Sequence, residues 1–114
     1  MNTYVIVFRR GRAALSETEQ QQLGQAIGPW AAAQNEAGHR LEPRLLTAEA
    51  RHYGPHAALA EADALPVTAL LFLDARDLDE AARVAQSHPG MNYGFSIEVR
   101  AWSGPQRAAT AAPR

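Results

Sequence analysis

The sequence predicts an α+β domain in which four strands and two helices follow the order β-α-β-β-α-β. Runs of β-branched and aromatic residues at 4–8, 67–73 and 95–102 are typical of strands. Segments with helical periodicity and N-terminal capping patterns begin at Ser16 and Asp77, between those strands. At 114 residues the chain can bury one sheet-and-helix core, not two.

The first strand and helix are the clearest elements of the N-terminal half. Residues 4–8 read Tyr-Val-Ile-Val-Phe, as a buried strand does. Ser16 and Glu19 form a capping box, and Gly38 is placed to end the helix. The helical spacing is kept by Leu23, Ala26, Ile27, Trp30, Gln34 and Ala37. Because Pro29 lacks a backbone donor, at a cost of about 3 kcal/mol, we expect a kink or a split there.

The middle of the chain is less regular. Residues 39–47 predict a second strand, which Pro43 confines to a sheet edge or a bulge. Residues 48–66 are alanine-rich and contain a turn at 52–56, with a short helix expected at 57–64. Residues 67–73 form a nearly continuous apolar run, which favours an interior strand.

The second half supplies the second helix and the last strand. Asp77 and Glu80 begin the helix, its narrow apolar face is Leu78, Ala81, Ala82 and Ala85, and Pro89-Gly90 ends it. In the strand at 95–102, one face consists of Phe95, Ile97, Val99 and Ala101. The other face consists of Ser96, Glu98, Arg100 and Trp102. An acid, a base and an indole on one face indicate a lined cavity or an interface.

This order of elements defines a ferredoxin-like four-stranded antiparallel sheet with both helices on one face. The opposite face is then left open, and an open face of that size usually marks an interface. Two-fold dimers are the commonest oligomers, so we expect a homodimer that packs sheet to sheet. Residues 1–102 form the predicted domain, and residues 103–114 a flexible tail.

Composition narrows the possible functions. The net charge of -1 gives no basic footprint for nucleic acid or an anionic membrane, and no apolar run is long enough to span a bilayer. The N-terminus lacks the pattern of a secretory signal, so we expect a cytoplasmic protein. There is no cysteine, and all 11 basic residues are arginine. Chemistry must therefore come from His, Asp/Glu, Tyr, Ser/Thr or Arg, and we expect no metal and no cofactor.

Several segments together resemble the YCII-related (YciI-like, including DGPF-type) family of dimeric α/β-barrel proteins. They are TYVIVFRR, AQNEAGHRLEP, the YGP turn, FLDARDLDEAARVAQSHPG and SIEVRAW. The resemblance implies a homodimer whose facing sheets enclose small-molecule pockets. Some family members look like lyases or dehalogenating enzymes acting on small cyclic or aromatic compounds.

The resemblance also bears on individual residues. Enzyme-like members carry a proposed acid/base histidine on the first helix, and Ile27 takes that place here. The family's DGPF-like tetrad reads Tyr53-Gly54-Pro55-His56 in this chain. Glu98 and Arg100 match the family's last strand, and the resemblance implies that they line a pocket.

The residues suggest a candidate site. Glu98 and Arg100, two apart on one strand face, can orient a polar ligand on which Trp102 stacks; an ordinary ion pair is the alternative. His56 is the candidate for proton transfer, with Glu98 as the second catalytic candidate. His52 and His56 are spaced as a helical metal pair, but Gly54-Pro55 between them argues against a helix.

Other candidates have equally plausible structural roles. Arg9 can bind an anionic ligand or lie exposed in a turn, and Tyr4 can face the cavity or pack in the core. Trp30, next to Pro29, is expected beside a pocket because a proline inside a helix breaks the local rules of helix formation. We assign Trp30 and Trp102 together to the apolar wall of the ligand site. His39 and His88 lie at predicted helix ends, where we interpret them as partners of the helix dipole.

Three functional hypotheses follow. The first is a homodimeric small-molecule-binding protein that catalyses cofactor-free proton transfer, of the lyase or isomerase type, on a cyclic or aromatic compound. The second is a non-catalytic ligand-binding or accessory dimer that lacks the family's acid/base histidine. The third, redox chemistry on a haem or quinone, is the least favoured.

Overall fold

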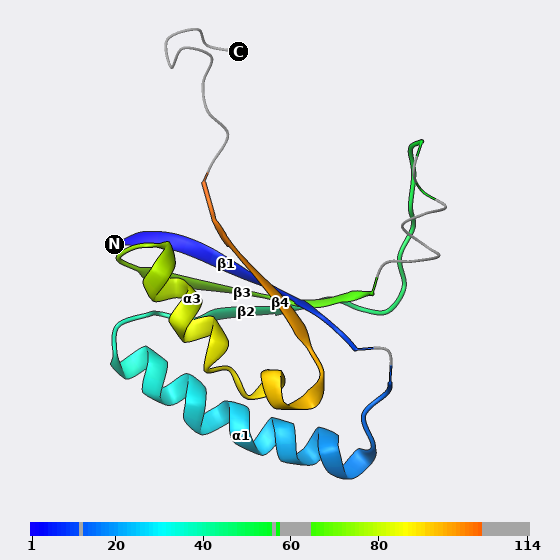
Figure 1. Cartoon of the computed structure of the whole chain (residues 1–114), viewed down its shortest axis with the longest axis horizontal. Coiled ribbons are helices and arrows are strands. Elements are labelled where there is room, and N and C mark those ends of the chain that lie inside the picture. Colours follow the sequence, from blue (N-terminus) through cyan, green and yellow to red (C-terminus); the bar gives the residue numbers. More distant parts are fainter. Residues whose placement is uncertain (12, 56, 58–64, 104–114) are drawn as a thin grey trace, which may run out of the picture.

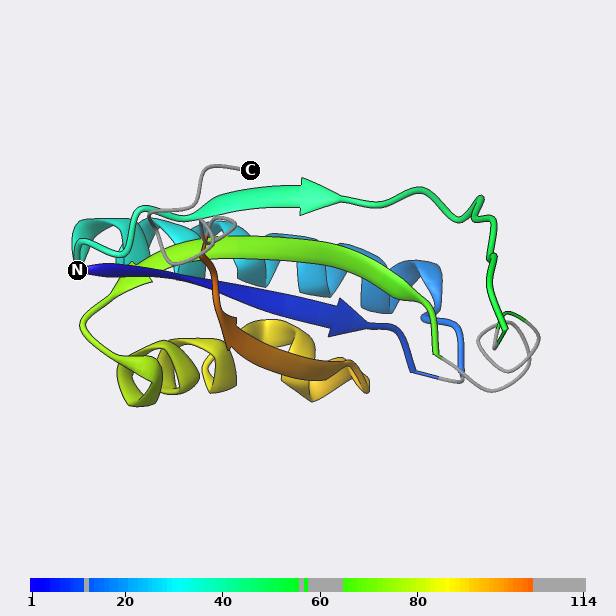
Figure 2. The same ribbon diagram turned by 90° about the horizontal axis from the view of Figure 1, so that it is seen from above.

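The predicted ferredoxin-like α+β fold is confirmed. The computed structural model describes residues 1–11, 13–55, 57 and 65–103. Strands β1 (Asn2–Arg9), β2 (Glu42–Leu45), β3 (Val67–Ala75) and β4 (Ser96–Ala101) form one antiparallel sheet in the order β2-β3-β1-β4. Helices α1 (Glu17–Glu36) and α3 (Leu78–Gln86) and the 3-10 helix η1 (Pro89–Tyr93) lie on one face of this sheet (Figures 1 and 2).

The core lies between the sheet and α3. Alternate side chains of β1, from Tyr4, Ile6 and Phe8, are buried against the helices. Leu71 and Leu73 of β3 pair with Ile6 and Tyr4 and share their face. Helix α3 packs onto this layer through Ala81, Val84 and Ala85. Small alanine side chains let that helix approach the sheet closely.

The alternation predicted for the last strand is confirmed by its register. Ile97 lies opposite Phe8 and Val99 opposite Ile6, and both pack against the core from the helix side. Glu98 and Arg100 therefore point to the opposite face. Within the described residues no helix covers that opposite face, which is turned towards the viewer in Figure 2.

Helix α1 begins at the predicted capping box and ends just before Gly38, where its end was expected. The Ser16 side chain accepts from the Glu19 amide at 3.1 Å, and the Glu19 carboxylate accepts from the Ser16 amide at 3.0 Å. The helix then runs unbroken through Pro29 to Glu36, so a split at the proline is wrong. One intrahelical hydrogen bond is lost there, which the rest of a 20-residue helix can tolerate.

The second strand is shorter than the predicted 39–47. His39 and Arg40 belong to the turn after α1, where Arg40 has a φ of 50° and the His39 carbonyl accepts from the Asp74 amide at 2.7 Å. The strand lies at the sheet edge, as Pro43 predicted. The helix expected at 57–64 and the tail expected at 103–114 lie, except for Ala57 and Ser103, outside the described residues.

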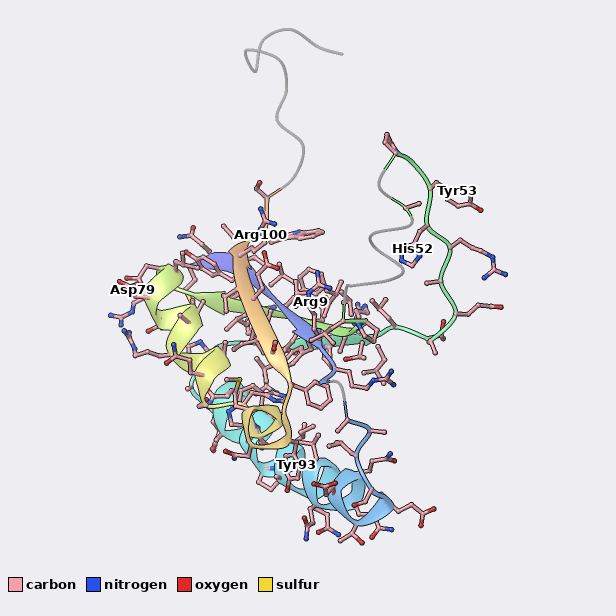
Figure 3. The ribbon with its side chains drawn as sticks, turned by 45° about the vertical axis from the view of Figure 1, so that its right-hand side comes forward. Arg9, His52, Tyr53, Asp79, Tyr93 and Arg100 are labelled. Atoms are coloured by element: carbon pink, nitrogen blue, oxygen red, sulfur yellow. The ribbon has the colours of Figure 1, made fainter. Side chains whose placement is uncertain are left out.

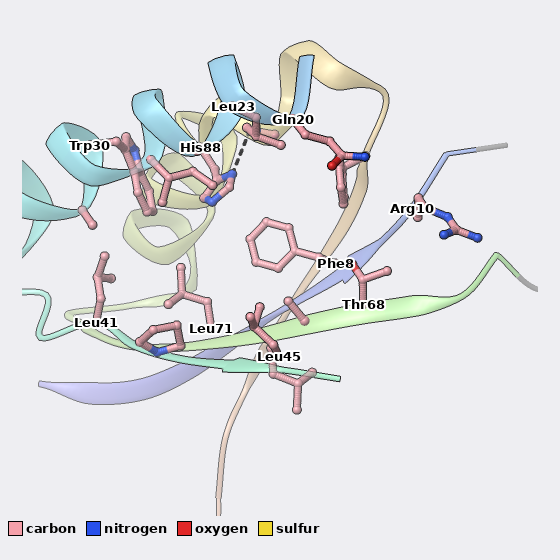
Figure 4. Close-up of a pocket in the computed structure, with 18 of the residues that line it drawn as sticks. Phe8, Arg10, Gln20, Leu23, Trp30, Leu41, Leu45, Thr68, Leu71 and His88 are labelled. Atoms are coloured by element: carbon pink, nitrogen blue, oxygen red, sulfur yellow. Dashed lines mark hydrogen bonds between the residues drawn. The ribbon is translucent and has the colours of Figure 1, made fainter. Parts of the chain in front are cut away.

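Helix α1 stands further from the sheet than α3 does. Leu23 is its one buried residue among the 20, although Ile27 and Trp30 are partly covered. Figure 4 shows that the side chains between α1 and the sheet border a hollow rather than filling it. In the described part of the chain, no helix is long and apolar enough to cross a membrane.

Candidate ligand pocket

A pocket of about 780 Å³ lies between α1 and the β2–β3 side of the sheet (Figure 4). Its volume falls within the range of small-molecule sites, roughly 300–1,000 Å³. Most of its surface is apolar. Its apolar lining includes Phe8, Leu23, Ile27, Trp30, Leu71 and Phe95.

Helical spacing accounts for the α1 wall of the pocket. Leu23, Ile27 and Trp30 are four and then three residues apart, so they share one helix face. The Trp30 Nε1–H donates to the Ser87 hydroxyl at 2.8 Å, and that hydroxyl donates to the Val84 carbonyl at 2.6 Å. This chain of two bonds ties α1 to the C-terminal end of α3. It holds the indole in the pocket wall.

His88 is the buried polar side chain of the pocket. It lies between α3 and η1 and is 9% exposed. Its ring is 4.7 Å from the ring of Phe8 and 4.7 Å from that of Trp30, centroid to centroid. Its Nδ1 accepts a hydrogen bond from the Gly90 amide at 2.9 Å. Burial lowers the pKa of His88 below its ordinary value of 6.5, because an imidazolium loses hydration there.

The sequence-based interpretation of His88 as a partner of the helix dipole is therefore wrong. A histidine that interacts with the dipole would be charged and near water, whereas this ring lies among aromatic side chains. One sequence signal for a fixed His88 ring was the His-Pro-Gly sequence after α3. Because Gly90 has no side chain, its amide can come close to the ring. Nothing in the sequence shows that the α1 indole meets this ring.

Polar residues border the pocket where β1 ends. Arg10 and Gln20 are exposed and Thr68 is partly buried, and Figure 4 shows the three on the same side of the hollow. The interior is therefore apolar apart from His88, and this part of the rim is polar. A ligand that enters from this side meets a cation and an amide first.

The predicted residues Glu98, Arg100 and Trp102 lie on the other face of the sheet. Arg100 Nη1 is 3.4 Å from Glu98 Oε2, and both side chains are largely exposed. The Trp102 ring stands against Phe72 at 4.9 Å, nearly perpendicular to it. Figure 3 shows Arg100 on this outer side. Glu98 and Arg100 therefore pair with each other, as the ion-pair alternative predicted, whereas Trp102 packs on Phe72. The sheet separates all three from Trp30.

The remaining candidates have separate positions. Tyr4 is 6% exposed in the core. Arg9 Nη1 donates to the Leu65 carbonyl at 2.9 Å, which links the end of β1 to the chain before β3. His52 lies in the segment that leaves the sheet after β2 (Figure 3), and His56 lies outside the described residues. Of the predicted site residues that the structure describes, Trp30 alone lines the pocket of about 780 Å³.

Trp102 borders a smaller hollow of about 450 Å³ on its side of the sheet, together with Thr3, Arg40, Glu42, Phe72, Leu73 and Asp74. Thr3 donates to Asp74 at 3.2 Å, and Arg40 lies 4.0 Å from the same carboxylate. The Asp74 carboxylate thus accepts from Thr3, and the largely exposed Arg40 side chain lies at the limit of an ion pair with it. Across the described residues, no three His, Cys, Asp or Glu side chains gather as metal ligands would.

Comparison with known proteins gives a likeness of fold. No protein-family model and no curated protein matches the chain. A similar solved structure is the 5-chloro-2-hydroxyhydroquinone dehydrochlorinase TftG from Burkholderia phenoliruptrix AC1100, in complex with 2,5-dihydroxybenzoquinone. It has 17% sequence identity and a TM-score of 0.42, over 90% of this chain and 95% of that one. The likeness concerns a small α/β fold, and no residue role is transferred from it.

Proposed function

We propose that this chain is a YCII-like protein that binds a small, mainly apolar organic molecule between α1 and the sheet. The observation that carries the proposal is the pocket of about 780 Å³ with apolar walls and one buried imidazole. Ligand sites in proteins combine a largely apolar cavity with a few placed polar groups. His88 supplies such a group, and the Trp30–Ser87 bond keeps the wall in place.

Binding without turnover is the function that the pocket supports best. Abstraction of a proton from carbon needs a base within reach of the ligand. Among the described residues that line the pocket there is no carboxylate. The His88 Nδ1 atom already accepts a hydrogen bond. Cofactor-free lyase or isomerase chemistry on a cyclic or aromatic compound is the second candidate, and it would require a base such as His56 to reach the pocket.

The open face of the sheet supports a homodimer as part of the same proposal. Val5, Val7 and Phe72 alternate with the core residues and so belong to this face, beside Trp102, which is 55% exposed. No helix of the described chain covers them. Val5 is already buried, so a second copy packed sheet to sheet would cover Trp102 and the parts of Val7 and Phe72 that are still exposed. The Glu98–Arg100 pair would then lie in or beside the interface.

The two tryptophans allow a direct test of where a ligand binds. Trp30 lines the pocket and Trp102 lies on the opposite face of the sheet. Trp102→Phe leaves the pocket indole as the sole tryptophan, and Trp30→Phe leaves the outer one. We expect 1-indanone, a small cyclic ketone that quenches indole fluorescence, to quench Trp30 saturably in Trp102→Phe. Quenching of Trp102 alone, or no saturation in either variant, would overturn the proposed site.

A further inference from the structure

The His88 ring is held in one tautomer. The Gly90 amide can only donate, so Nδ1, which accepts from it at 2.9 Å, carries no proton. A neutral imidazole has one ring proton, which must therefore sit on Nε2. The position of Gly90 is part of this arrangement. A Cβ atom there would lie 3.0 Å from Nδ1 and 3.3 Å from Cε1 of the same ring.

The Nε2–H group is directed into the pocket. Figure 4 shows the edge of the ring away from the Gly90 bond turned towards the hollow between Trp30 and Leu71. No group in the described part of the chain forms a hydrogen bond with Nε2, yet no fully buried side-chain nitrogen or oxygen there lacks a partner. Nε2 is therefore not fully buried, and because His88 lines the pocket, its proton faces space that a ligand can occupy.

The surroundings keep the ring uncharged. The two rings in contact with His88, those of Phe8 and Trp30, carry no charge. Arg10, the cationic residue of the pocket, is exposed at the rim. Burial also lowers the pKa of His88, which favours the neutral form at neutral pH. His88 thus offers a donor, and its unprotonated nitrogen is already occupied.

We propose that His88 is the recognition residue of this pocket, and that its Nε2–H donates to the carbonyl oxygen of a small, uncharged ligand. This inference rests on the proposed function, because it specifies the chemical class of ligand for the same pocket. A carboxylate in that position would be a charge among apolar walls. A hydroxyl would bring a second donor of its own with no partner there. A carbonyl oxygen accepts without either cost.

The first test compares two probes of the same shape. 1-Indanone carries a ring carbonyl, and indane has a methylene in its place. Their dissociation constants are measured from the shifts of the Leu23 and Gly90 amide signals in NMR titrations of the full chain. One neutral hydrogen bond in a pocket predicts that 1-indanone binds about 2- to 12-fold more tightly than indane.

Two variants assign that preference to His88. His88→Phe keeps a ring and removes the donor, so the two probes should bind equally. His88→Gln keeps an N–H donor of similar reach and should retain part of the preference. Equal binding of the probes to the wild type would overturn this inference and leave the proposed pocket intact. Binding of neither probe would overturn both.

A measurement without ligand or variant tests the tautomer by itself. In ¹⁵N spectra of the imidazole groups, the His88 ring should show a protonated Nε2 and an unprotonated Nδ1 at neutral pH. A ring protonated at Nδ1, or at both nitrogens, would contradict the proposed donor. This result does not depend on whether 1-indanone is a good probe.

Discussion

The Gly90 amide donates to His88 Nδ1 across 2.9 Å, two residues along the chain, in the turn that leads from α3 into η1. This bond orients a buried imidazole between the rings of Phe8 and Trp30. The His88 ring thereby joins three elements, because it follows α3 and contacts Phe8 of the sheet and Trp30 of α1. The pocket and its polar group therefore depend on a short segment of backbone.

Replacing Gly90 by alanine should disturb this arrangement. The added Cβ would lie 3.0 Å from His88 Nδ1, and the ring cannot easily move because aromatic side chains flank it. We expect Gly90→Ala to lower the free energy of unfolding by about 1 to 3 kcal/mol, as overpacking does. Urea denaturation measures this change in the free energy of unfolding. Gly24→Ala is the control, because a Cβ at Gly24 meets no atom within 4 Å; an equal effect at both positions would refute the explanation.

The pH dependence of stability should carry a contribution from His88. Burial lowers its pKa in the folded protein below 6.5, the ordinary value that applies in the unfolded chain. Between those two values the unfolded state binds more protons, so the free energy of unfolding falls as pH falls through this window. At pH values below the His88 pKa of the folded protein, the His88 contribution to the free energy of unfolding changes no further.

His88→Gln removes this contribution. Denaturation at about pH 7.5 and about pH 5.5 should therefore show a smaller loss of stability in His88→Gln than in the wild type. The other histidines are present in both proteins and cancel in the comparison. An identical loss in the two proteins would mean that the His88 pKa is not lowered by burial.

The bond between Trp30 and Ser87 should couple the two helices energetically. Trp30→Phe removes the donor and Ser87→Ala removes the acceptor of a 2.8 Å hydrogen bond. In a double-mutant cycle we expect a coupling free energy of about 1 kcal/mol. Thermal or urea unfolding of the four proteins gives this number. Strictly additive effects would show that the bond does not hold α1 in place.

The open face of the sheet should determine the oligomeric state. Trp102→Glu places a charge beside Phe72 on that face, and should shift the proposed dimer towards monomer. Leu78→Glu is the control, because Leu78 is 49% exposed on α3, away from this face. Sedimentation velocity measures both variants and the wild type. A monomeric wild type, or equal dissociation by both variants, would count against a sheet-to-sheet dimer.

Much of the fold could be predicted because local signals and burial agree. The Ser16–Glu19 box, the position of Pro43 at an edge and the two faces of β4 each follow from residues close together in the chain. That α1 continues through Pro29 could not be predicted. The cost of one lost hydrogen bond is local, whereas the contacts that offset it are spread over the whole helix.

The pocket was harder to predict because it is built from distant residues. Trp30 was selected for a local irregularity and does line the pocket, but its neighbours come from β1, β3 and the turn after α3. The sequence placed Trp30 and Trp102 in one site, whereas the sheet lies between them. The burial of His88 could not be predicted, because it comes from Phe8 of β1 and Trp30 of α1, which are far from it in the chain.

The most direct measurement is a crystal structure of the protein with 1-indanone. We expect density for the ketone between α1 and the sheet, with its oxygen about 3 Å from His88 Nε2. The Gly90 bond to Nδ1 should be retained. Density beside Trp102 on the opposite face, or a pocket closed by movement of α1 onto the sheet, would contradict this expectation.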